Sequence, residues 1–425
     1  MRHAVAVVVF LLAAVSLSAA TFQAPADADL LGRADLVVVA RVSGATVRET
    51  ADRMIFTDHR LEVEEVLKGN AAPSIVVSEL GGFVNGHGIA VPGSASYAPG
   101  TRVVAFLRQR DDGTYFTTYM ALGKYRFDRD LLVRDLDGIE ADDDRIYAAR
   151  PANEFIAHLR GEAPPARFVE SDARPVETNA GAADYVLTGG GRPLRYDCPS
   201  ACTVEWTVGA PQMGTVNTAE GVEDAMAAWT NEPNAWITLD IGGFNNHTGS
   251  TNNDINDIVF NSNDTAGVCD SSLGCGIVYF NGAPDQHTFD GTQFNDIVSS
   301  DVVIRPINFT GQAFFEAVIA HELGHAIGLK HAPTSGNLMS TSLASAASAA
   351  LKSWDKEAVA EVYGTGLPCV APTITGTSGG GTVPFGETKQ LSVTVAAGAT
   401  APLSYQWYRG QPENTSVPVG GNSDK

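Results

Sequence analysis

The chain has 425 residues, of which 44% are hydrophobic and 18% are charged, and its formal net charge is −21. This composition is typical of a folded protein rather than a disordered one, and the length allows two or three domains. Nucleic acid is excluded as an expected partner, because phosphate binding needs clustered Lys and Arg that so acidic a chain does not supply.

Residues 1–20 have the pattern of a secretory signal peptide. Arg2 supplies the positive start, residues 5–17 form a short apolar run, and residues 18–20 are small and suited to cleavage. The apolar run is too short to span a bilayer, which needs ~20 residues, and no later segment is long and apolar enough. We therefore expect a secreted, extracellular protein with no transmembrane segment.

Five cysteines in an exported chain favour disulfides over free thiols. Cys198 and Cys202 are close in the sequence, as are Cys269 and Cys275, so two local bridges are the simplest of the three pairings that four cysteines allow. Cys369 is then left over, and it could be free or pair elsewhere. A zinc site made of cysteines is the competing interpretation, and the histidine cluster described below is a better one.

Residues 25–160 contain five segments rich in Val, Thr and aromatic residues, separated by turns that contain glycine. Such segments are typical of β-strands, which we predict at 34–41, 60–66, 74–79, 102–107 and 115–119. The phrases ADLVVVARV, VEEVLKG and YAPGTRVVAFLR resemble a β module found ahead of other domains in bacterial secreted proteins, a resemblance that implies no chemistry. We predict an all-β domain over 25–160 and a Pro- and Ala-rich linker over 161–183.

The next region combines helices with a sheet. Apolar residues at helical spacing predict an amphipathic helix over 220–231, with Met226 and Trp229 in the core. From 236 to 304, short β-like runs alternate with loops rich in Asn, Asp and Gly, which indicates a sheet with long connections. Two more helices are predicted, one over 312–327 with Thr310 as its N-cap and one over 354–363.

The loops of this sheet hold many Asp and Asn side chains, for instance at 252–257 and 261–264. Hard oxygen ligands of this kind could bind Ca²⁺. No spacing matches the twelve-residue EF-hand loop, however, so turn formation is the favoured interpretation.

The helix predicted over 312–327 leads into the sequence HELGHAIGLKH at 321–331. His321 and His325 are four residues apart, so both imidazoles project from one helix face and can bind one metal ion. Gly328 can adopt the left-handed conformation that ends a helix, which lets His331 reach the same ion from another direction. Three neutral imidazoles and one open position describe a catalytic Zn²⁺ site rather than a structural one.

Glu322 directly follows the first metal ligand and is the predicted general base. Zinc lowers the pKa of a bound water to about 7, and the Glu322 carboxylate is placed to take its proton as the water attacks a peptide carbonyl. The five fixed residues of this pattern would arise by chance in a chain of this length about once in ten thousand sequences, so the pattern is specific. For His158, His247 and His287 a core or surface role is favoured.

The motif resembles that of the metzincins, zinc peptidases in which HExxHxxGxxH is followed by a turn that contains a methionine. Met339 lies downstream of His331 at a distance similar to that in the matrixin branch, and the resemblance covers 184–366. It implies an α+β domain with a twisted, mostly parallel sheet, an active-site helix, a C-terminal helix, and Met339 as the hydrophobic floor under the metal. It also implies that 301–304 is the edge strand along which an extended substrate pairs.

Three features depart from the matrixin pattern. Ser340 and Thr341 replace the aromatic and proline residues that commonly follow the methionine, so the pocket for the side chain after the scissile bond cannot be transferred. The residue two positions past Met339 is not a tyrosine, so no tyrosine ligand is expected. The cysteine-switch motif of matrixin propeptides is absent, which leaves the mechanism of latency open, and the β domain at 25–160 could contribute to latency or not.

From residue 371 the composition shifts to Gly, Thr, Ser and Val. The phrases QLSVTV and PLSYQWYRG resemble the opening strands of a bacterial immunoglobulin-like domain, with Trp407 as the core tryptophan of its third strand. We expect a partial domain of this type over 371–425 and a protein that continues further, since such a domain needs ~100 residues. Contact with a cell surface or matrix through this segment is left open.

The sequence thus predicts a secreted zinc endopeptidase that hydrolyses protein or peptide substrates. A second hypothesis is a surface adhesion protein in which the β and immunoglobulin-like modules bind a partner and the zinc site is residual. The intact Glu322 argues against it, because a site without hydrolytic activity has no chemical need for the carboxylate. Hydrolysis of a non-peptide bond is a third hypothesis, and the resemblance favours peptides.

Overall fold

The structure is a computed structural model whose described part begins at residue 25. The predictions for the signal peptide, most of the linker, Thr310, Cys369 and loop 261–264 lie outside the described residues. Among the residues that are described, no helix is long and apolar enough to cross a membrane. The described ranges are 25–134, 148–169, 185–198, 202–209, 216–247, 252–260, 272–289, 291–305, 311–334, 336–341 and 347–364, with a few single residues between them and four strands after 370.

The N-terminal part of the chain forms an eight-stranded sheet, in the order β1-β2-β3-β7-β6-β8-β9-β10. Strand β1 pairs with β2 on one side and with β6 on the other, so β1, β2, β3, β7 and β6 close into a ring. Each of the five strands predicted here overlaps an observed one. The strands are β1 (Leu36–Glu49), β2 (Ile55–Lys68), β3 (Ser74–Leu80), β6 (Arg102–Gln109), β7 (Tyr115–Thr117), β8 (Lys124–Asp128), β9 (Leu131–Arg134) and β10 (Arg150–Pro151).

The apolar start of β1 is buried on both faces, which explains why it has no alternation of polar and apolar residues. Val38 and Ala40 point into the ring, whereas Val37 and Val39 belong to a second cluster on its outer face. The helices α1 (Asp27–Arg33) and α3 (Ala152–Leu159) cover that outer face. This region is therefore not all-β as predicted, because two short amphipathic helices are needed to bury the outer apolar residues.

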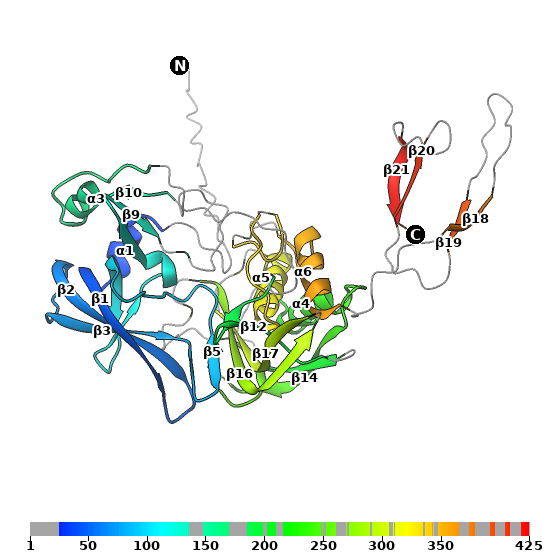
Figure 1. The fold of residues 1–425 in the computed structure, drawn as a ribbon, viewed down its shortest axis with the longest axis horizontal. Helices are drawn as coiled ribbons and strands as arrows, with labels where there is room; N and C mark the ends of the chain where they lie inside the picture. The colour runs from blue at the N-terminus through cyan, green and yellow to red at the C-terminus, as the bar shows by residue number, and fades with distance from the viewer. Residues whose placement is uncertain are drawn as a thin grey trace, which may run out of the picture.

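The second sheet has the order β14-β13-β15-β17-β16-β5-β4, where β4 is Gly82–Val84 and β5 is His87–Ala90, and β12 also pairs with β17. Its part from β12 to β17 is mostly parallel, as predicted, with β16 antiparallel to β17. Figure 1 shows α4, α5 and α6 gathered beside this sheet. The elements are β11 (Thr188–Gly189), β12 (Arg192–Arg195), β13 (Cys202–Gly209), α4 (Thr218–Thr230), β14 (Ile237–Asn245), β15 (Asn256–Phe260), β16 (Gly274–Phe289), β17 (Thr292–Ile304), α5 (Gln312–Ala326) and α6 (Ser353–Tyr363).

The prediction that residues 301–304 form the edge strand is wrong. These residues end β17, which lies between β15 and β16 and pairs with both. They are buried on both faces of the sheet, as expected for a central strand. The strand that borders this part of the sheet is β16, because the chain enters β17 through a hairpin after β16 and inserts it between β16 and β15.

The three predicted helices of this region form, with ends within two residues of the predicted ones. Asn217 caps α4 through its side-chain oxygen, which accepts a hydrogen bond from the backbone N–H of Glu220. Trp229 of α4 is fully buried, and its indole N–H donates to the carbonyl oxygen of Ala320 in α5 at 2.8 Å. This contact fixes the two helices against each other.

Two strands of the N-terminal region belong to the second sheet and not to the ring of strands. The strands β4 (Gly82–Val84) and β5 (His87–Ala90) form a hairpin, and β5 pairs antiparallel with β16 of the second sheet. Asn85 and Gly86 both have positive φ, 55° and 86°, which is the two-residue hairpin turn that Asn-Gly favours. The predicted boundary at 160 therefore does not separate two independent sheets.

The C-terminal segment contains two separate strand pairs, on the right of Figure 1. Two pairs do not make a sandwich, so the immunoglobulin-like domain stays a prediction. The proposed core position of Trp407, in β20, concerns a side chain outside the described part. The pairs are β18 (Ile374–Ser378) with β19 (Ser392–Val395), and β20 (Ser404–Tyr408) with β21 (Pro418–Asp424).

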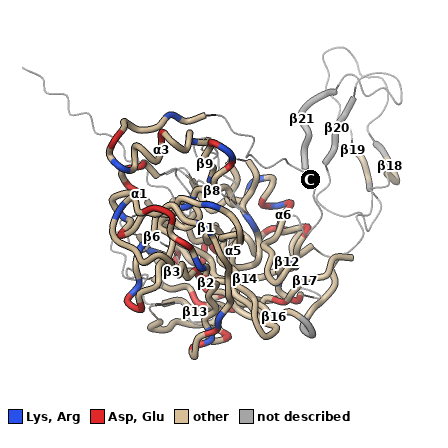
Figure 2. The backbone as a smooth tube through the Cα atoms, turned by 60° about the vertical axis from the view of Figure 1, so that its left-hand side comes forward, with Lys and Arg blue, Asp and Glu red and all other residues tan. Residues whose placement is uncertain are grey.

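Charged residues of both signs are interspersed along the chain. In the view of Figure 2, Lys and Arg alternate with Asp and Glu around α1, α3 and the strands of the ring, with no continuous basic stripe. The described surface in this view thus offers no basic stripe for a phosphate backbone.

A buried carboxyl group lies in the N-terminal ring. Glu79 accepts hydrogen bonds from the backbone N–H and the hydroxyl of Thr117, at 2.8 and 2.6 Å. Burial raises the pKa of Glu79 to about 7, although these hydrogen bonds and the charges of Arg110 and Lys124 act in the opposite direction. The folded protein therefore holds this proton at pH values where an unfolded chain has lost it.

Replacement of Glu79 by Gln should remove a pH dependence of stability. A group whose pKa is raised on folding stabilises fully below its unfolded pKa, near 4.5, and this contribution is lost as the pH rises through about 7. The free energy needed to open the ring of strands is compared between the parent and Glu79→Gln at each pH. The parent value minus the variant value should fall by about 3 kcal/mol as the pH rises from about 4.5 to about 7. Hydrogen exchange of peptides from β3, corrected for intrinsic rates, measures this difference.

The comparison must be made as a difference between the two proteins. Burial lowers the pKa of His59 to about 4, which makes stability rise with pH in both proteins and cancels in the difference. A difference that does not change between pH 4.5 and 7.5 would show that Glu79 is ionised in the folded ring.

Candidate active site

Three histidines converge at the end of α5. His321 and His325 lie in the helix and His331 lies six residues past His325, and one ring nitrogen from each falls within 4.8 Å of the others. All three side chains are buried, and the Nε2 atoms of His325 and His331 are 3.0 Å apart. The structure thus brings together the three residues that the sequence predicted as metal ligands.

The turn after α5 directs His331 back toward the helix. Gly328 has φ of +97°, its N–H donates to the His325 carbonyl, and the N–H of Leu329 donates to the Gly324 carbonyl, which is the Schellman arrangement. A Cβ atom on Gly328 would lie 2.6 Å from the carbonyl oxygen of Leu194. Both the backbone conformation and the lack of space therefore require glycine at this position.

Hydrogen bonds to carbonyl groups set the tautomers of the two helical histidines. The Nδ1–H of His321 donates to the Leu338 oxygen at 2.6 Å, and that of His325 donates to the Leu329 oxygen at 2.8 Å. Because a carbonyl oxygen can only accept, Nδ1 carries the proton in each ring and Nε2 keeps its lone pair. These Nε2 atoms are the ones that can bind a metal.

The electrostatics of the site favour neutral imidazoles. Burial lowers the pKa of His321 to about 4, and burial together with the proximity of His321 lowers the pKa of His325 well below its usual value. Among the described residues, Nε2 of His321 has no hydrogen-bond partner. A buried nitrogen of this kind, beside two more imidazoles, fits Zn²⁺, which takes neutral histidine nitrogens as ligands.

Met339 lies against the active-site helix between its two histidines. The residue is fully buried, and a Cβ atom on Gly324 would overlap its sulfur atom. The Met339 carbonyl accepts a hydrogen bond from Ala332, next to His331. Met339 therefore forms a hydrophobic surface next to the histidine cluster, where the resemblance to metzincins placed it.

Asp355, which sequence analysis missed, holds the turn that contains Met339. Its carboxylate, in the first turn of α6, accepts hydrogen bonds from the backbone N–H groups of Leu338 and Met339 at 2.7 and 2.9 Å, and from Lys352 at 2.8 Å. Burial raises its pKa, and these three hydrogen bonds oppose that effect. The Leu338 carbonyl in turn orients His321, so Asp355 acts on a metal ligand through one residue. An Asp in the first turn of a predicted helix was the available signal.

Glu322 is fully buried beside the histidines. Burial raises its pKa to about 8, and the backbone N–H of Gly276 in β16 acts in the opposite direction. A Cβ atom on Gly274 would lie 2.9 Å from Cγ of Glu322, and one on Gly276 would lie 2.9 Å from Cβ of His325. The glycines thus let β16 pass very close to the helix that carries Glu322 and the two histidines.

The remaining predicted residues lie outside this cluster. The structure contains the Cys198–Cys202 and Cys269–Cys275 disulfides, and Cys275 of the second lies in β16, between Gly274 and Gly276. His247 contacts Asp257 and His287 contacts Asp296.

The Asn- and Asp-rich loop at 252–257 ends at Asp257, whose carboxylate accepts hydrogen bonds from protein groups. Asp257 is fully buried and accepts hydrogen bonds from Asn245, Asn253 and His247. Protein donors thus satisfy this carboxylate, as expected for a turn, and Ca²⁺ at this loop remains a prediction.

Comparison with known proteins supports a zinc metallopeptidase in general. Residues 205–364 match the matrixin family, a range that includes α4, the histidine motif, Met339 and α6. No curated protein matches the chain. Metalloproteinase-II from Bacteroides fragilis is similar to it at 11% identity over 75% of this chain and 86% of that chain, with a TM-score of 0.24, which is too low to establish a shared fold.

Replacement of Asp355 by Asn should weaken zinc binding without unfolding the protein. The oxygen of the amide accepts hydrogen bonds but its nitrogen only donates, so the backbone N–H of Leu338 or of Met339 loses its acceptor. The Leu338 carbonyl that orients His321 should then shift. Loss of such support typically costs about 10- to 100-fold in metal affinity. Competition with a chromophoric chelator measures the affinity on the full chain.

Glu357→Gln is the matched control, because Glu357 is exposed on the same helix. The zinc-free variants should have the far-ultraviolet circular dichroism of the parent. Equal zinc affinities of Asp355→Asn and the control would show that Asp355 does not position the ligand.

Proposed function

We propose that this protein is a secreted zinc-dependent endopeptidase in which His321, His325 and His331 bind the metal and Glu322 is the general base. The observation that supports it best is the convergence of three buried imidazoles, two with Nε2 set free by hydrogen bonds of Nδ1, beside a buried carboxyl group. The matrixin match over 205–364 supports the same class of enzyme.

Zinc bound by the imidazoles would supply a Lewis acid that lowers the pKa of water to about 7. The chain's own contribution is to move protons and to hold the substrate. Glu322 takes a proton from the attacking water and delivers it to the leaving amine. Without a metal, burial raises the pKa of Glu322 to about 8, and the charge of a bound cation would favour the ionised carboxylate that can take the proton.

An extended peptide would bind along the border strand of the mostly parallel part of the sheet. That strand is β16, whose first residues pass beside Glu322 and His325. Strand addition satisfies the backbone groups of the peptide without regard to its side chains, which suits a protease that cleaves within unfolded segments.

Replacement of Glu322 by Gln should abolish hydrolysis and preserve zinc. The amide has nearly the shape of the carboxyl group but cannot take the proton, so hydrolysis of a denatured, fluorescently labelled protein should fall by at least about 10²-fold. The matched control is Glu316→Gln, in the same helix but outside the histidine cluster. Bound zinc is quantified in all three proteins, and removal of zinc with a chelator should inactivate the parent.

The assay is made on the intact chain and after cleavage at a protease site introduced between Val169 and Tyr185. Zinc retained by Glu322→Gln together with lost activity would support the proposal. If parent and variant hold zinc and neither hydrolyses protein in either form, the peptidase proposal fails and the adhesion hypothesis replaces it.

A further inference from the structure

The border of β16 that faces away from β17 is occupied by the chain's own N-terminal region. Strand β5 pairs with it antiparallel, with Val278 opposite Ala90, Tyr279 opposite Ile89 and Phe280 opposite Gly88. The N–H of Gly282 extends the contact by donating to the Gly86 carbonyl at 2.8 Å. This border is where the proposed function places an extended peptide.

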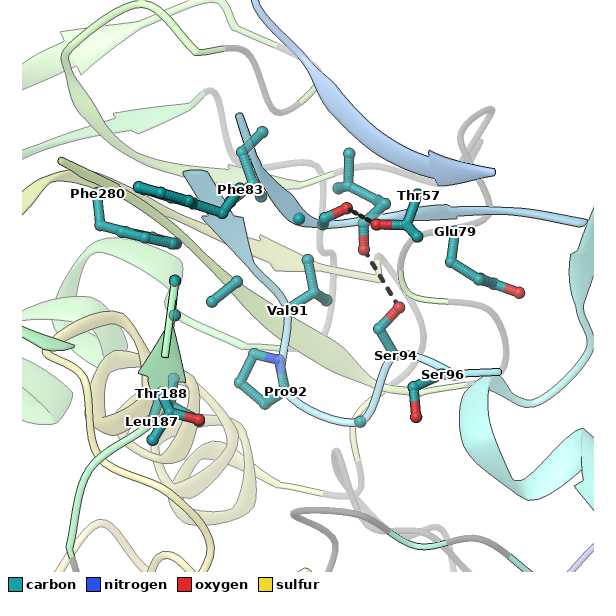
Figure 3. A pocket seen from close by; sticks show the side chains of 18 of the residues that line it. Thr57, Glu79, Phe83, Val91, Pro92, Ser94, Ser96, Leu187, Thr188 and Phe280 are labelled. Atoms are coloured by element: carbon teal, nitrogen blue, oxygen red, sulfur yellow. Dashed lines mark hydrogen bonds between the residues drawn. The ribbon is translucent and has the colours of Figure 1, made fainter. Parts of the chain in front are cut away.

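An aromatic contact fixes the register of this pairing. The ring of Phe280 stacks on that of Phe83, with centroids 5.8 Å apart and planes 4° apart (Figure 3). A Cβ atom on Gly88 or on Gly189 would overlap the Phe280 ring. The ring is 2% exposed, so it fills a pocket that only glycine at these two positions leaves open.

The two regions also share a hydrophobic cluster. Ile55, Leu80 and Ile89 from the N-terminal region pack in one buried cluster with Ile277 and Tyr279 of β16. The polar contacts at its rim join the side chain of Asn252 to the Arg53 carbonyl at 3.0 Å, and Arg53 to Asp254 at 2.9 Å.

The contact is nevertheless incomplete. A cavity of about 640 Å³ lies beside this contact, between the strands of the N-terminal region and residues 186–190 (Figure 3). A contact that combines a four-residue strand with an adjoining cavity resembles a releasable interface between domains more than a continuous core.

Beyond β5 the chain leads to the metal site. Because β5 is antiparallel to β16, the residues after Ala90 run toward Gly276 and Gly274, which lie beside His325 and Glu322. Pro92 and Met120 line a cavity together with Glu322, His325 and His331. The space open to the centre of a water molecule there is about 10 Å³, which is room for about one water.

We propose that the N-terminal region is an internal inhibitor of the peptidase. Strand β5 takes the border of β16 that a substrate would pair with, and Pro92 and Met120 leave no room for a peptide bond between β16 and the histidines. This inference rests on the proposed function. The block is steric, because Val91 and Pro92 have no metal-binding side-chain atoms and the usual ligands of Zn²⁺ in proteins are Cys thiolates, His nitrogens and carboxylates, not a thioether such as that of Met120. Activity then requires displacement of β5.

The test uses the full zinc-loaded chain and one substitution outside the histidine cluster. Gly88→Val places a branched side chain where the Phe280 ring lies, whereas Gly44→Val, in β1 of the same region, has no atom within 4 Å of its Cβ position. Hydrolysis of denatured protein should rise at least tenfold in Gly88→Val and stay at the parent rate in Gly44→Val. The exchange of amide hydrogens in peptides covering 277–281 should rise in Gly88→Val alone, which reports release of the border independently of activity.

A second form of the test does not depend on a substitution at the contact. Cleavage between Val169 and Tyr185 turns the internal inhibitor into a separate partner, so the effective concentration imposed by the connection is lost. The specific activity of the cleaved protein should then rise on dilution and fall again as the concentration is restored, while that of the uncleaved chain stays constant.

The two proposals fail in different ways. If the uncleaved parent already hydrolyses protein as fast as Gly88→Val and the diluted, cleaved chain, the peptidase stands and the inhibitor is overturned. If amide exchange in 277–281 rises on release but no form hydrolyses protein, β5 does cover the border and the peptidase function is overturned.

Discussion

The metal centre depends on the reversal of the chain at Gly328. A helix can present two imidazoles on one face, but the third must approach from another direction. The turn that reverses the chain also satisfies the last carbonyls of α5, and its Leu329 carbonyl accepts the Nδ1–H of His325. One turn therefore ends the helix, directs His331 and fixes the tautomer of a neighbouring ligand. Because φ at Gly328 is +97° and the Leu194 carbonyl lies against it, no other residue can do this without strain.

Burial acts in opposite directions on the ligands and on the base, and both effects make the site neutral without a metal. It lowers the pKa of His321 and His325 and raises that of Glu322 to about 8, so none of these side chains carries an uncompensated charge inside the protein at neutral pH. A divalent cation changes this balance, because its charge favours an ionised carboxylate nearby.

Sequence reasoning singled out His321, Glu322, His325, His331, Gly328 and Met339, which the structure brings together, because each belongs to one short stretch with fixed spacing. It also predicted α4, α5, α6 and most strands, since their periodicity is local, but it missed α1 and α3. It failed where the answer depended on strand order: 301–304 has the composition of either an edge or a central strand, and only the pairing with β15 and β16 decides between them. The Asn85-Gly86 turn signalled the β4–β5 hairpin, but no local pattern could show that its partner lies almost two hundred residues away.

Under the proposed function, the border of β16 must meet two conflicting demands. A protease that binds peptides by strand addition needs an unpaired strand, yet an unpaired strand also pairs with other chains and promotes aggregation. Pairing with β5 resolves the conflict, provided that β5 can dissociate from β16. The structure favours such a cover, because β5 itself contributes only four residue pairs, and the stacked phenylalanines and the shared hydrophobic cluster lie beside a cavity of about 640 Å³. A longer strand over a filled interface would protect the border equally well, but a substrate could displace it only at a much larger cost in buried surface.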